Sequence, residues 1–518
     1  MMEINENQKV AGDNAPLLNE YDTFLGVNTS KPPTIKSSVP FRSNRIIPPF
    51  LLLLSLASIL VIFVVFDQRK SAERSISNTM TSSNDVGSSA PHIMMVTLDD
   101  VGTRAFTPLT VGTATISVTR YMDKLIEQGV WLENYYGQSS CTPARATLMT
   151  GKFVHRYGWS AQWPPSSEID PTSDWSVPKS YKLLPAHLQE LGYKTHGWGK
   201  WNIGHCSESY LPTSRGFESF LGYFGQGIDY MTYNVSAYEY DGFDMLSMNA
   251  SGYEPVPGGV SADVLFLQDM RSKLSSLGDS SSPVFSWMAL HGAHDDKTLN
   301  GPDAVIPTEL DNPRVEYVLE AISSAESYES GENLNFIKTL LGLDMLVHLL
   351  KLSMDKLSSY TGRDYLLIVN SDNGGAPCAD YEIASNIPWR GSKFNYFEGG
   401  IKVPGFIYSP SSSVIPASSA GSSYTGLIHH VDWIASLRSV AGATVALDET
   451  YDSMDLWDEM AGRTTPLDRA RTLYIALGGR ESDENFYCVS LKGKYKLLYD
   501  VYNAKDIAPN RSSTMCAN

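Results

Sequence analysis

Two short apolar runs, each leading into acidic side chains, place the strongest constraint on how this chain can fold. The first run is Ile93–Leu98, which leads into Asp99-Asp100, and the second is Tyr365–Asn370, which leads into Ser371–Gly375. Runs of this kind are typical of buried parallel strands, and ligands in open α/β sheets gather beyond the carboxyl ends of such strands. The chain is therefore predicted to be an α/β protein with a functional site at that edge.

The side chains after these runs form a candidate metal site. Asp99, Asp100, Asp372 and Asn373 offer only oxygen ligands. Such a set suits a hard cation, Ca²⁺ or Mg²⁺, and lacks the Cys or His expected for zinc. The alternative is an ordinary solvated turn after each strand. The repetition of the pattern after both runs favours the metal.

Cys141 lies in the second candidate feature, the stretch Ser139–Gly151. Pro143 suits the first turn of a helix, where its missing N–H costs nothing. Cys141 is then expected at a helix N-terminus, where the macrodipole and Arg145 favour negative charge, as an anionic nucleophile or substrate would require. The alternative is a buried or disulfide-bonded cysteine before an ordinary helix.

The whole stretch reads Cys-x-Pro-x-Arg-x-x-Leu-x-Thr-Gly, and it resembles the signature of the type I sulfatases at every fixed position. The resemblance implies that Cys141 is converted to formylglycine by the formylglycine-generating enzyme. In that family the hydrated aldehyde attacks the sulfur of a sulfate ester, and its second hydroxyl then expels sulfate. The resemblance extends from Pro91 to about Asp500. It implies an alkaline-phosphatase-like α/β sandwich, with a large mixed sheet between helices and a small antiparallel C-terminal sheet domain.

The resemblance also implies roles for the candidate metal ligands and for one lysine. Asp99, Asp100, Asp372 and Asn373 match residues that hold one Ca²⁺, and the modified Cys141 is expected as a fifth ligand. Lys200, in Gly199–Gly204, matches a lysine that bridges the diol and the sulfate.

One position in this motif departs from the family. Asn202 stands where the family has a histidine that helps to expel sulfate, and asparagine can hydrogen-bond but cannot titrate. His205, three residues further on, is a candidate substitute.

Two more residues match positions that contact the sulfate ester. His294, which follows the strand-like run Phe285–Leu290, matches the acid that protonates the leaving alcohol; a structural histidine is the alternative. The family's proline two residues later is Asp296 here. Lys393, in Pro388–Lys393, matches a lysine that binds sulfate oxygens. With Arg145, Lys200 and the metal, these groups are expected to neutralise charge on the sulfuryl group.

Three further segments are interpreted as framework. Pro212–Gly222, continuing to Gly227–Tyr230, resembles the arylsulfatase B subgroup, the N-acetylgalactosamine-4-sulfatase-like enzymes, and has no assigned catalytic role. His429 is interpreted as a core histidine that caps a helix. A helical repeat of apolar residues predicts a long amphipathic helix on the sheet, at Ile337, Leu341, Met345, Leu349 and Leu352.

The N-terminal ninety residues predict a membrane anchor. Phe50–Phe66 is almost wholly apolar, and Ile46-Ile47 extend it to the about 20 residues that span a bilayer. A cleaved signal peptide fits less well, because residues 1–45 precede the run and no small-x-small site follows it. We therefore predict a disordered cytoplasmic tail (1–45), a transmembrane signal anchor (46–66) and a Ser-rich stem (67–90).

This arrangement makes the chain a single-pass type II membrane protein. Its catalytic domain is expected in the lumen of the Golgi, endosome or lysosome, or at the cell surface. In the tail, Asp13–Leu18 resembles an acidic dileucine sorting signal, which predicts adaptor binding at Leu17-Leu18. The sequons at Asn234, Asn249 and Asn510 are usable only in such a compartment.

Composition and the C-terminal pattern complete the domain organisation. The net charge of −17 argues against nucleic-acid binding. Five cysteines leave at least one outside any intramolecular disulfide; Cys141 is the natural candidate, and the other four could form two bridges. The catalytic domain is predicted at 91–446. A small α+β domain is predicted at 447–518, with a hairpin of Tyr487–Leu491 and Tyr495–Tyr499.

These patterns leave three functional hypotheses. The first is a Ca²⁺-dependent sulfatase that hydrolyses sulfated sugars, glycosaminoglycan-like glycans or aryl sulfates. The second is a catalytically impaired relative that binds sulfated glycans, because Asn202 replaces the histidine. The third, a phosphohydrolase of the same superfold, is disfavoured, since such enzymes generally carry Ser or Thr where Cys141 stands.

Overall fold

The computed structural model describes residues 90–499 with several gaps, and all of these residues belong to one compact unit, Ser83–Asn518. The gaps are 112–113, 160–168, 170–171, 236–241, 278–281, 295–317, 319–330, 377–385, 468–470 and 480–485.

Several predictions fall outside the described residues. They are the tail (1–45) with Leu17-Leu18, the signal anchor (46–66), residues 67–89 of the stem, and the sequon at Asn510. Within the described part of the chain, no helix is both long enough and apolar enough to cross a bilayer.

A ten-stranded mixed sheet forms the centre of the described domain, as predicted. In spatial order its strands are β12 (Ser422–His429), β4 (Val130–Tyr136), β11 (Gly405–Tyr408), β10 (Tyr365–Ser371), β1 (His92–Leu98), β9 (Val284–Ala289), β5 (Lys194–Lys200), β6 (Ser219–Tyr223), β7 (Leu246–Asn249) and β8 (Gly252–Pro255). The two predicted strands, β1 and β10, pair in parallel, and β9 is parallel to β1 on its other side. β11 and β7 run antiparallel to their neighbours.

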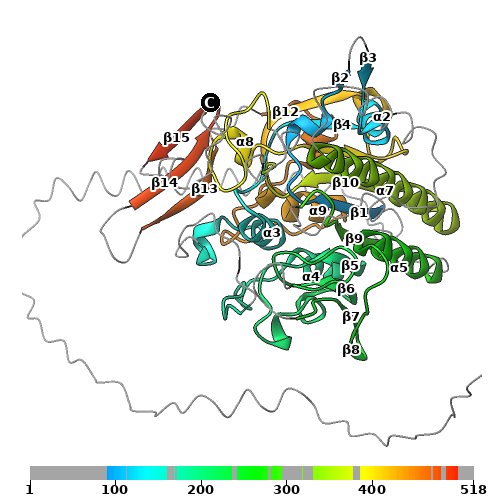
Figure 1. Ribbon diagram of the computed structural model, residues 1–518. Coiled ribbons are helices and arrows are strands. Elements are labelled where there is room, and N and C mark those ends of the chain that lie inside the picture. The colour runs from blue at the N-terminus through cyan, green and yellow to red at the C-terminus, as the bar shows by residue number, and fades with distance from the viewer. Residues whose placement is uncertain are drawn as a thin grey trace, which may run out of the picture. The chain divides into compact units, whose positions relative to one another are not determined.

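Both faces of the sheet are apolar, which explains why helices cover both. Along β1, Met94 and Val96 enter one hydrophobic core, whereas Ile93 and Met95 enter the other. The first core is closed by α2 (Arg120–Gln128), α5 (Ala262–Ser276) and α7 (Gly331–Thr361). The second is closed by α3 (Cys141–Thr150), α4 (Leu184–Glu190), α9 (Trp433–Val440) and α10 (Trp457–Met460). Figure 1 shows α5 and α7 side by side.

The predicted long helix is confirmed as α7. Ile337 and Leu341 are fully buried in the first core, whereas Leu352, near the other end of the repeat, is 42% exposed. The helix ends at Thr361, and the chain then enters β10. Because α7 leads into β10, and β10 ends directly before Asp372, we interpret α7 as a scaffold that positions this part of the site.

A separate three-stranded antiparallel sheet near the C-terminus confirms the predicted hairpin. Its strands are β13 (Thr472–Gly479), β14 (Phe486–Lys492) and β15 (Tyr495–Tyr499), coloured red in Figure 1. One face of this sheet shares a hydrophobic core with Tyr136 and Val431 of the main domain, through Leu473, Ile475 and Val489. A domain boundary at 447 stays a prediction.

The remaining elements are small: α8 (Glu398–Ile401) and the hairpin of β2 (Leu109–Val111) and β3 (Ala114–Ile116). Cys206 and Cys488 are free thiols, so the two predicted bridges do not form among the described cysteines; Cys378 and Cys516 lie outside them. Asn234 and Asn249 are both exposed.

Candidate active site

The carboxyl edge of the central sheet collects the predicted site residues, because four parallel strands end there. Asp99 and Asp100 follow β1, and Asp372 and Asn373 follow β10. Lys200 is the last residue of β5, and His294 lies five positions beyond the end of β9. Every one of these side chains is at most 5% exposed. Residues almost 300 positions apart therefore meet at one buried point.

Buried ion pairs hold this group together. Lys200 Nζ lies 2.9 Å from Oδ2 of Asp99, and Lys393 Nζ lies 2.9 Å from Oδ2 of Asp100. Arg145 donates to Oδ2 of Asp372 from Nη2 (2.8 Å) and from Nε (3.1 Å). Burial alone raises the pKa of Asp99, but the charges of Lys200 and Arg145 outweigh that effect and hold this pKa well below its usual value.

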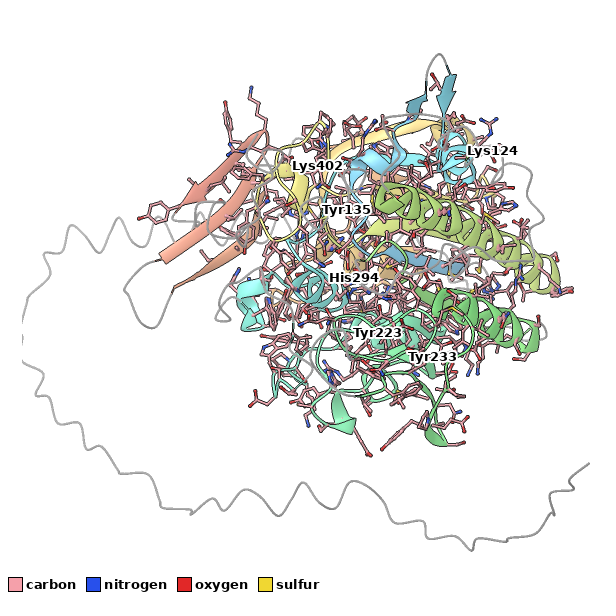
Figure 2. All side chains as sticks on the ribbon, in the orientation of Figure 1. Lys124, Tyr135, Tyr223, Tyr233, His294 and Lys402 are labelled. Carbon is pink, nitrogen blue, oxygen red and sulfur yellow. The ribbon has the colours of Figure 1, made fainter. Side chains whose placement is uncertain are left out.

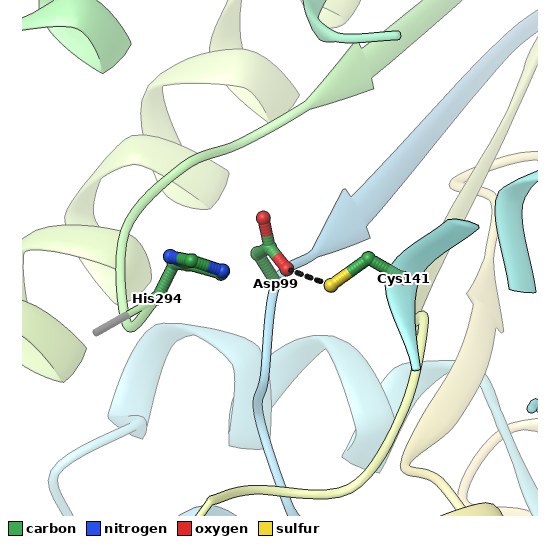
Figure 3. A group of neighbouring side chains, drawn as sticks. All are labelled: Asp99, Cys141 and His294. Atoms are coloured by element: carbon green, nitrogen blue, oxygen red, sulfur yellow. Dashed lines mark hydrogen bonds between the residues drawn. The ribbon is translucent and has the colours of Figure 1, made fainter. Parts of the chain in front are cut away.

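Cys141 is the first residue of α3, as the proline two positions later predicted. Its Sγ lies 3.2 Å from Oδ1 of Asp99 and 3.8 Å from Oδ1 of Asp100. Figure 3 shows the sulfur pointing from the helix start toward Asp99, with the ring of His294 beyond that carboxylate. The helix dipole favours negative charge at this position. Any oxygen that replaced the sulfur would lie among the same groups.

The residues predicted to bind a metal fit a hard cation. Oxygens of Asp99, Asp100 and Asp372 and the Sγ of Cys141 lie within 4.8 Å of one another. Asn373 donates its Nδ2 to Asp100 (2.6 Å), while its Oδ1 is buried without a hydrogen-bond partner. Burial and the charge of Asp99 raise the pKa of Asp372 to about 7, a repulsion that a divalent cation would offset. The set offers oxygen ligands with an orphaned amide oxygen, which suits Ca²⁺.

His294 faces the cationic side of the group. Its Nε2 lies 3.5 Å from Nζ of Lys393, and its Nδ1 is buried without a hydrogen-bond partner. Burial lowers the pKa of His294 well below its usual value, and the charges of Lys200 and Lys393 lower it further. Figure 2 shows His294 and Tyr223 in the interior of the domain. Figure 3 shows one ring nitrogen of His294 directed toward Asp99, so the ring lies beside the group that would bind a substrate.

Asn202 is engaged in the framework of the site. Its Oδ1 accepts from the hydroxyl of Thr142 (2.8 Å), and its Nδ2 donates to the carbonyl of Gly225 (3.1 Å). The residue has φ 51°, a left-handed conformation that asparagine tolerates better than most residues. It therefore ties the first turn of α3 to the loop after β6. The ring of His205 lies near that of Phe224, with 6.1 Å between centroids, so that histidine is part of a packing contact.

Sequence reasoning missed the residues that support this group. Asp263 and Tyr230 hydrogen-bond to the turn that carries His294, and Tyr223 bonds to His291. An acidic residue in the first turn of a helix is too common to single out Asp263. The interpretation of His429 is confirmed: it is buried, and its ring accepts from the N–H of Val431 at the start of a short 3₁₀ helix.

Comparisons with known proteins agree with this geometry. The Sulfatase family model matches residues 91–443. Arylsulfatase J of Mus musculus is 31% identical over 380 residues, which are 72% of this chain and 56% of arylsulfatase J. N-acetylgalactosamine-6-sulfatase of Rattus norvegicus is 24% identical over 388 residues, 71% of this chain and 66% of that protein. The matched part of this chain thus spans between about half and two thirds of the length of these relatives. The arylsulfatase B subgroup stays a prediction.

Solved structures resemble the chain in fold. Ps i-CgsB, in complex with k-i-k-neocarrahexaose, has a TM-score of 0.63 at 20% identity and covers 83% of this chain and 89% of its own. The PsFucS1 sulfatase from Pseudoalteromonas sp. has a TM-score of 0.58 at 21% identity, with coverage of 79% and 78%. BT4656, in complex with its substrate D-glucosamine-2-N,6-O-disulfate, has a TM-score of 0.51 at 16% identity, with coverage of 80% and 92%. The predicted alkaline-phosphatase-like fold is confirmed, and with the match of the family model over residues 91–443 the chain belongs to the sulfatase family.

Proposed function

We propose that this chain hydrolyses sulfate esters, with sulfated sugars or aryl sulfates as its substrates. The observation that carries the proposal is the buried group in which Cys141 Sγ lies 3.2 Å from Asp99 and in which Lys200 and Lys393 bind the two adjacent carboxylates. Oxidation of Cys141 to formylglycine would supply a hydrated carbonyl as the nucleophile. A Ca²⁺ held by Asp99, Asp100, Asp372 and Asn373 would supply positive charge for the sulfuryl oxygens.

Charge balance supports an anionic substrate. The three carboxylates of the group face three cations, Arg145, Lys200 and Lys393, so that the protein side chains balance one another. A divalent cation bound by these carboxylates would make the whole group positive, so that a sulfuryl group could bind as the counter-charge. Lys200 and Lys393 are the cations that we assign to the sulfate oxygens, because both ammonium groups are buried beside the carboxylates of the candidate metal site, and an ammonium group can donate up to three hydrogen bonds.

His294 is assigned the role of proton donor to the leaving alcohol. In the free protein its ring is neutral, because burial and then the nearby lysines lower its pKa. A sulfate ester between Lys200 and Lys393 brings negative charge that offsets the lysines and raises this pKa. The ring can then hold a proton at the nitrogen that faces the substrate and pass it to the ester oxygen as the S–O bond breaks.

A second candidate function rests on Asn202. Because its amide is bonded to Thr142 and Gly225 and cannot titrate, the chain lacks a base at the position where the family has histidine. General-base help is typically worth about 10²–10⁴-fold. In this case the chain would cleave a sulfate ester once and release sulfate slowly, acting mainly as a binder of sulfated glycans.

The two candidates differ in their kinetics with para-nitrophenyl sulfate. A sulfatase with full turnover gives a linear release of nitrophenol. The binder gives a burst equal to the enzyme concentration, followed by a slow steady rate. If Cys141 is the nucleophile, the variant Cys141→Ala should show no burst, and its rate of nitrophenol release should fall by on the order of 10⁶-fold. Hydrolysis that survives this substitution would overturn the proposal.

Location and partners belong to the same proposal. Conversion of Cys141 requires the formylglycine-generating enzyme, and the predicted anchor at 46–66 would place residues 90–499 on the lumenal or extracellular side. The exposed sequons at Asn234 and Asn249 support that side of the membrane. A loss of apparent mass in gel electrophoresis when the full chain is treated with an N-glycosidase would test it, and the loss should be smaller in the double variant Asn234→Gln/Asn249→Gln, which keeps the sequon at Asn510.

A further inference from the structure

The turn that carries His294 is fixed by groups from outside the catalytic motifs. This turn is His291–His294, and it begins two residues after the end of β9. It closes on itself through the N–H of His294, which donates to the carbonyl of His291 (3.2 Å). Within it, Ala293 has φ 76°. An L-residue in this left-handed region costs roughly 1–2 kcal/mol, so other contacts must hold the turn in place.

Asp263 holds the start of the turn. Its Oδ1 accepts from the N–H of His291 and its Oδ2 from the N–H of Gly292, both at 2.8 Å. The carboxylate is fully buried in the first turn of α5, and burial raises its pKa to about 6 despite these two bonds. A buried carboxylate is costly unless its bonds are made, so its position and that of the turn are coupled.

Tyr230 holds both ends of the turn. Its hydroxyl lies 3.0 Å from the carbonyl oxygen of His291 and 3.1 Å from that of His294, so one donor is shared between them. Two residues that precede Tyr230 in the chain also hold the turn, through the ring of His291. Its Nε2 lies 2.9 Å from the carbonyl of Ile228, and its Nδ1 lies 2.8 Å from the hydroxyl of Tyr223. The carbonyl must accept, so Nε2 carries a proton and donates it to Ile228. These two bonds make His291 a structural residue of the turn.

We propose that Asp263 and Tyr230 are positioning residues that hold His294 against the leaving oxygen of the substrate, so that they govern the cleavage of esters of weakly acidic alcohols. This inference rests on the proposed sulfatase activity. It gives a role to the segment Gly227–Tyr230, which sequence comparison left without one. In the step concerned, the nucleophile at position 141 would form a bond to the sulfur while the S–O bond to the alcohol breaks. The ester oxygen keeps the electron pair of the broken bond, and the proton of His294 neutralises that oxygen as the alcohol leaves.

The proposal makes a selective prediction, because not every leaving group needs a proton. A nitrophenolate is stable as an anion, whereas the alkoxide of a sugar is not and requires the acid. Displacement of His294 by even a fraction of an ångström should therefore slow cleavage of a monosaccharide sulfate much more than cleavage of para-nitrophenyl sulfate. A substitution that merely loosens the fold would slow both alike.

The experiment compares kcat/KM for these two esters in Tyr230→Phe and Asp263→Asn. This parameter reports the steps up to departure of the alcohol, so slow sulfate release does not mask them. The ratio of the two values is also independent of how much of a preparation is correctly folded. Two matched controls exist: Tyr193→Phe removes another buried hydroxyl that donates to a backbone carbonyl (Pro91, 2.8 Å), and Asp344→Asn alters another buried carboxylate that accepts from two adjacent backbone N–H groups.

We expect the ratio of kcat/KM for the sugar sulfate to kcat/KM for nitrophenyl sulfate to fall by about tenfold in both variants. This is a part of the about 10²–10⁴-fold that a general acid contributes, because His294 is displaced and not removed. In Tyr193→Phe and Asp344→Asn the ratio should stay as in the wild type. An unchanged ratio in Tyr230→Phe and Asp263→Asn, with the wild type cleaving both esters, would overturn the positioning role and leave the sulfatase proposal standing. A wild type that converts neither ester, with Cys141 oxidised, would overturn the proposed function itself.

Discussion

The charged group around Cys141 and the turn His291–His294 meet at the same buried point, yet they are held in different ways. In the charged group, each lysine or arginine lies within 2.9 Å of a carboxylate, so that the chemistry-bearing side chains position one another. In the turn, the residue with the chemistry is held through its backbone by Asp263 and Tyr230. The contrast teaches that ion pairs between side chains fix the sulfate end of the site, whereas hydrogen bonds to the backbone fix the leaving-group end.

Lys200→Met removes one cation from the charged group and should have the largest effect on stability. Among the described residues, this leaves the fully buried Asp99 with Arg145, at 3.4 Å, as its ion-pair partner, and breaking a buried pair in this way costs about 3–5 kcal/mol. Urea unfolding measures the loss. The matched control is Lys182→Met, because Lys182 pairs with Glu190 at 2.6 Å on the surface, where such a pair is worth about 0–1 kcal/mol. Equal losses in the two variants would contradict the assignment of the charged group as a stabilising unit.

Calcium should act on the charged group and leave the turn unaffected. Binding at a Ca²⁺ concentration of about 100 times Kd should raise the free energy of unfolding by about 2.7 kcal/mol relative to chelated protein. We expect the cation to bind here because it would offset the repulsion between Asp372 and Asp99, which raises the pKa of Asp372. Asp263→Asn should show the same gain, whereas Asn373→Ala should show a smaller one. Unfolding curves that coincide with and without Ca²⁺ would speak against a metal at this edge.

Asn202→His separates the two candidate functions. The ring cannot reproduce both the bond to Thr142 and the bond to Gly225, so we expect a loss of about 1–2 kcal/mol in unfolding free energy. We also expect no gain in steady-state turnover, because position 202 supports the first turn of α3. Pre-steady-state and steady-state assays with para-nitrophenyl sulfate measure this. A faster steady rate in the variant would instead favour the slow-release candidate.

Ala293→Gly should have the smallest effect. Relief of the left-handed strain is worth roughly 1–2 kcal/mol, but loss of a buried methyl group (about 0.8 kcal/mol) and added freedom in the unfolded chain offset it. The unfolding free energy should stay within about 1 kcal/mol of the wild type. The ratio of kcat/KM for the two esters should not change, because Asp263 and Tyr230 still hold the turn. A fall in that ratio as large as in Tyr230→Phe would show that Ala293 itself fixes the geometry.

The difference between the two regions also decided what could be predicted from the sequence. Asp99, Asp372 and Cys141 stand in short motifs at strand and helix ends, so that local pattern and the geometry of parallel strands suffice to bring them together. Tyr230 and Asp263 act on backbone atoms of residues up to 64 positions away, and backbone donors and acceptors leave no mark in the sequence. The same limit hid the framework role of Asn202, whose partners Thr142 and Gly225 come from two other segments.

The central claim is that a modified Cys141, set between Asp99 and the buried cations, acts on the sulfuryl group. Mass spectrometry of the peptide that contains Cys141, prepared from cells that carry the oxidising system, tests it most directly. The account predicts a peptide in which sulfur and two hydrogens are exchanged for one oxygen, in a preparation that hydrolyses para-nitrophenyl sulfate. An unmodified thiol in a preparation that still hydrolyses this ester would contradict it.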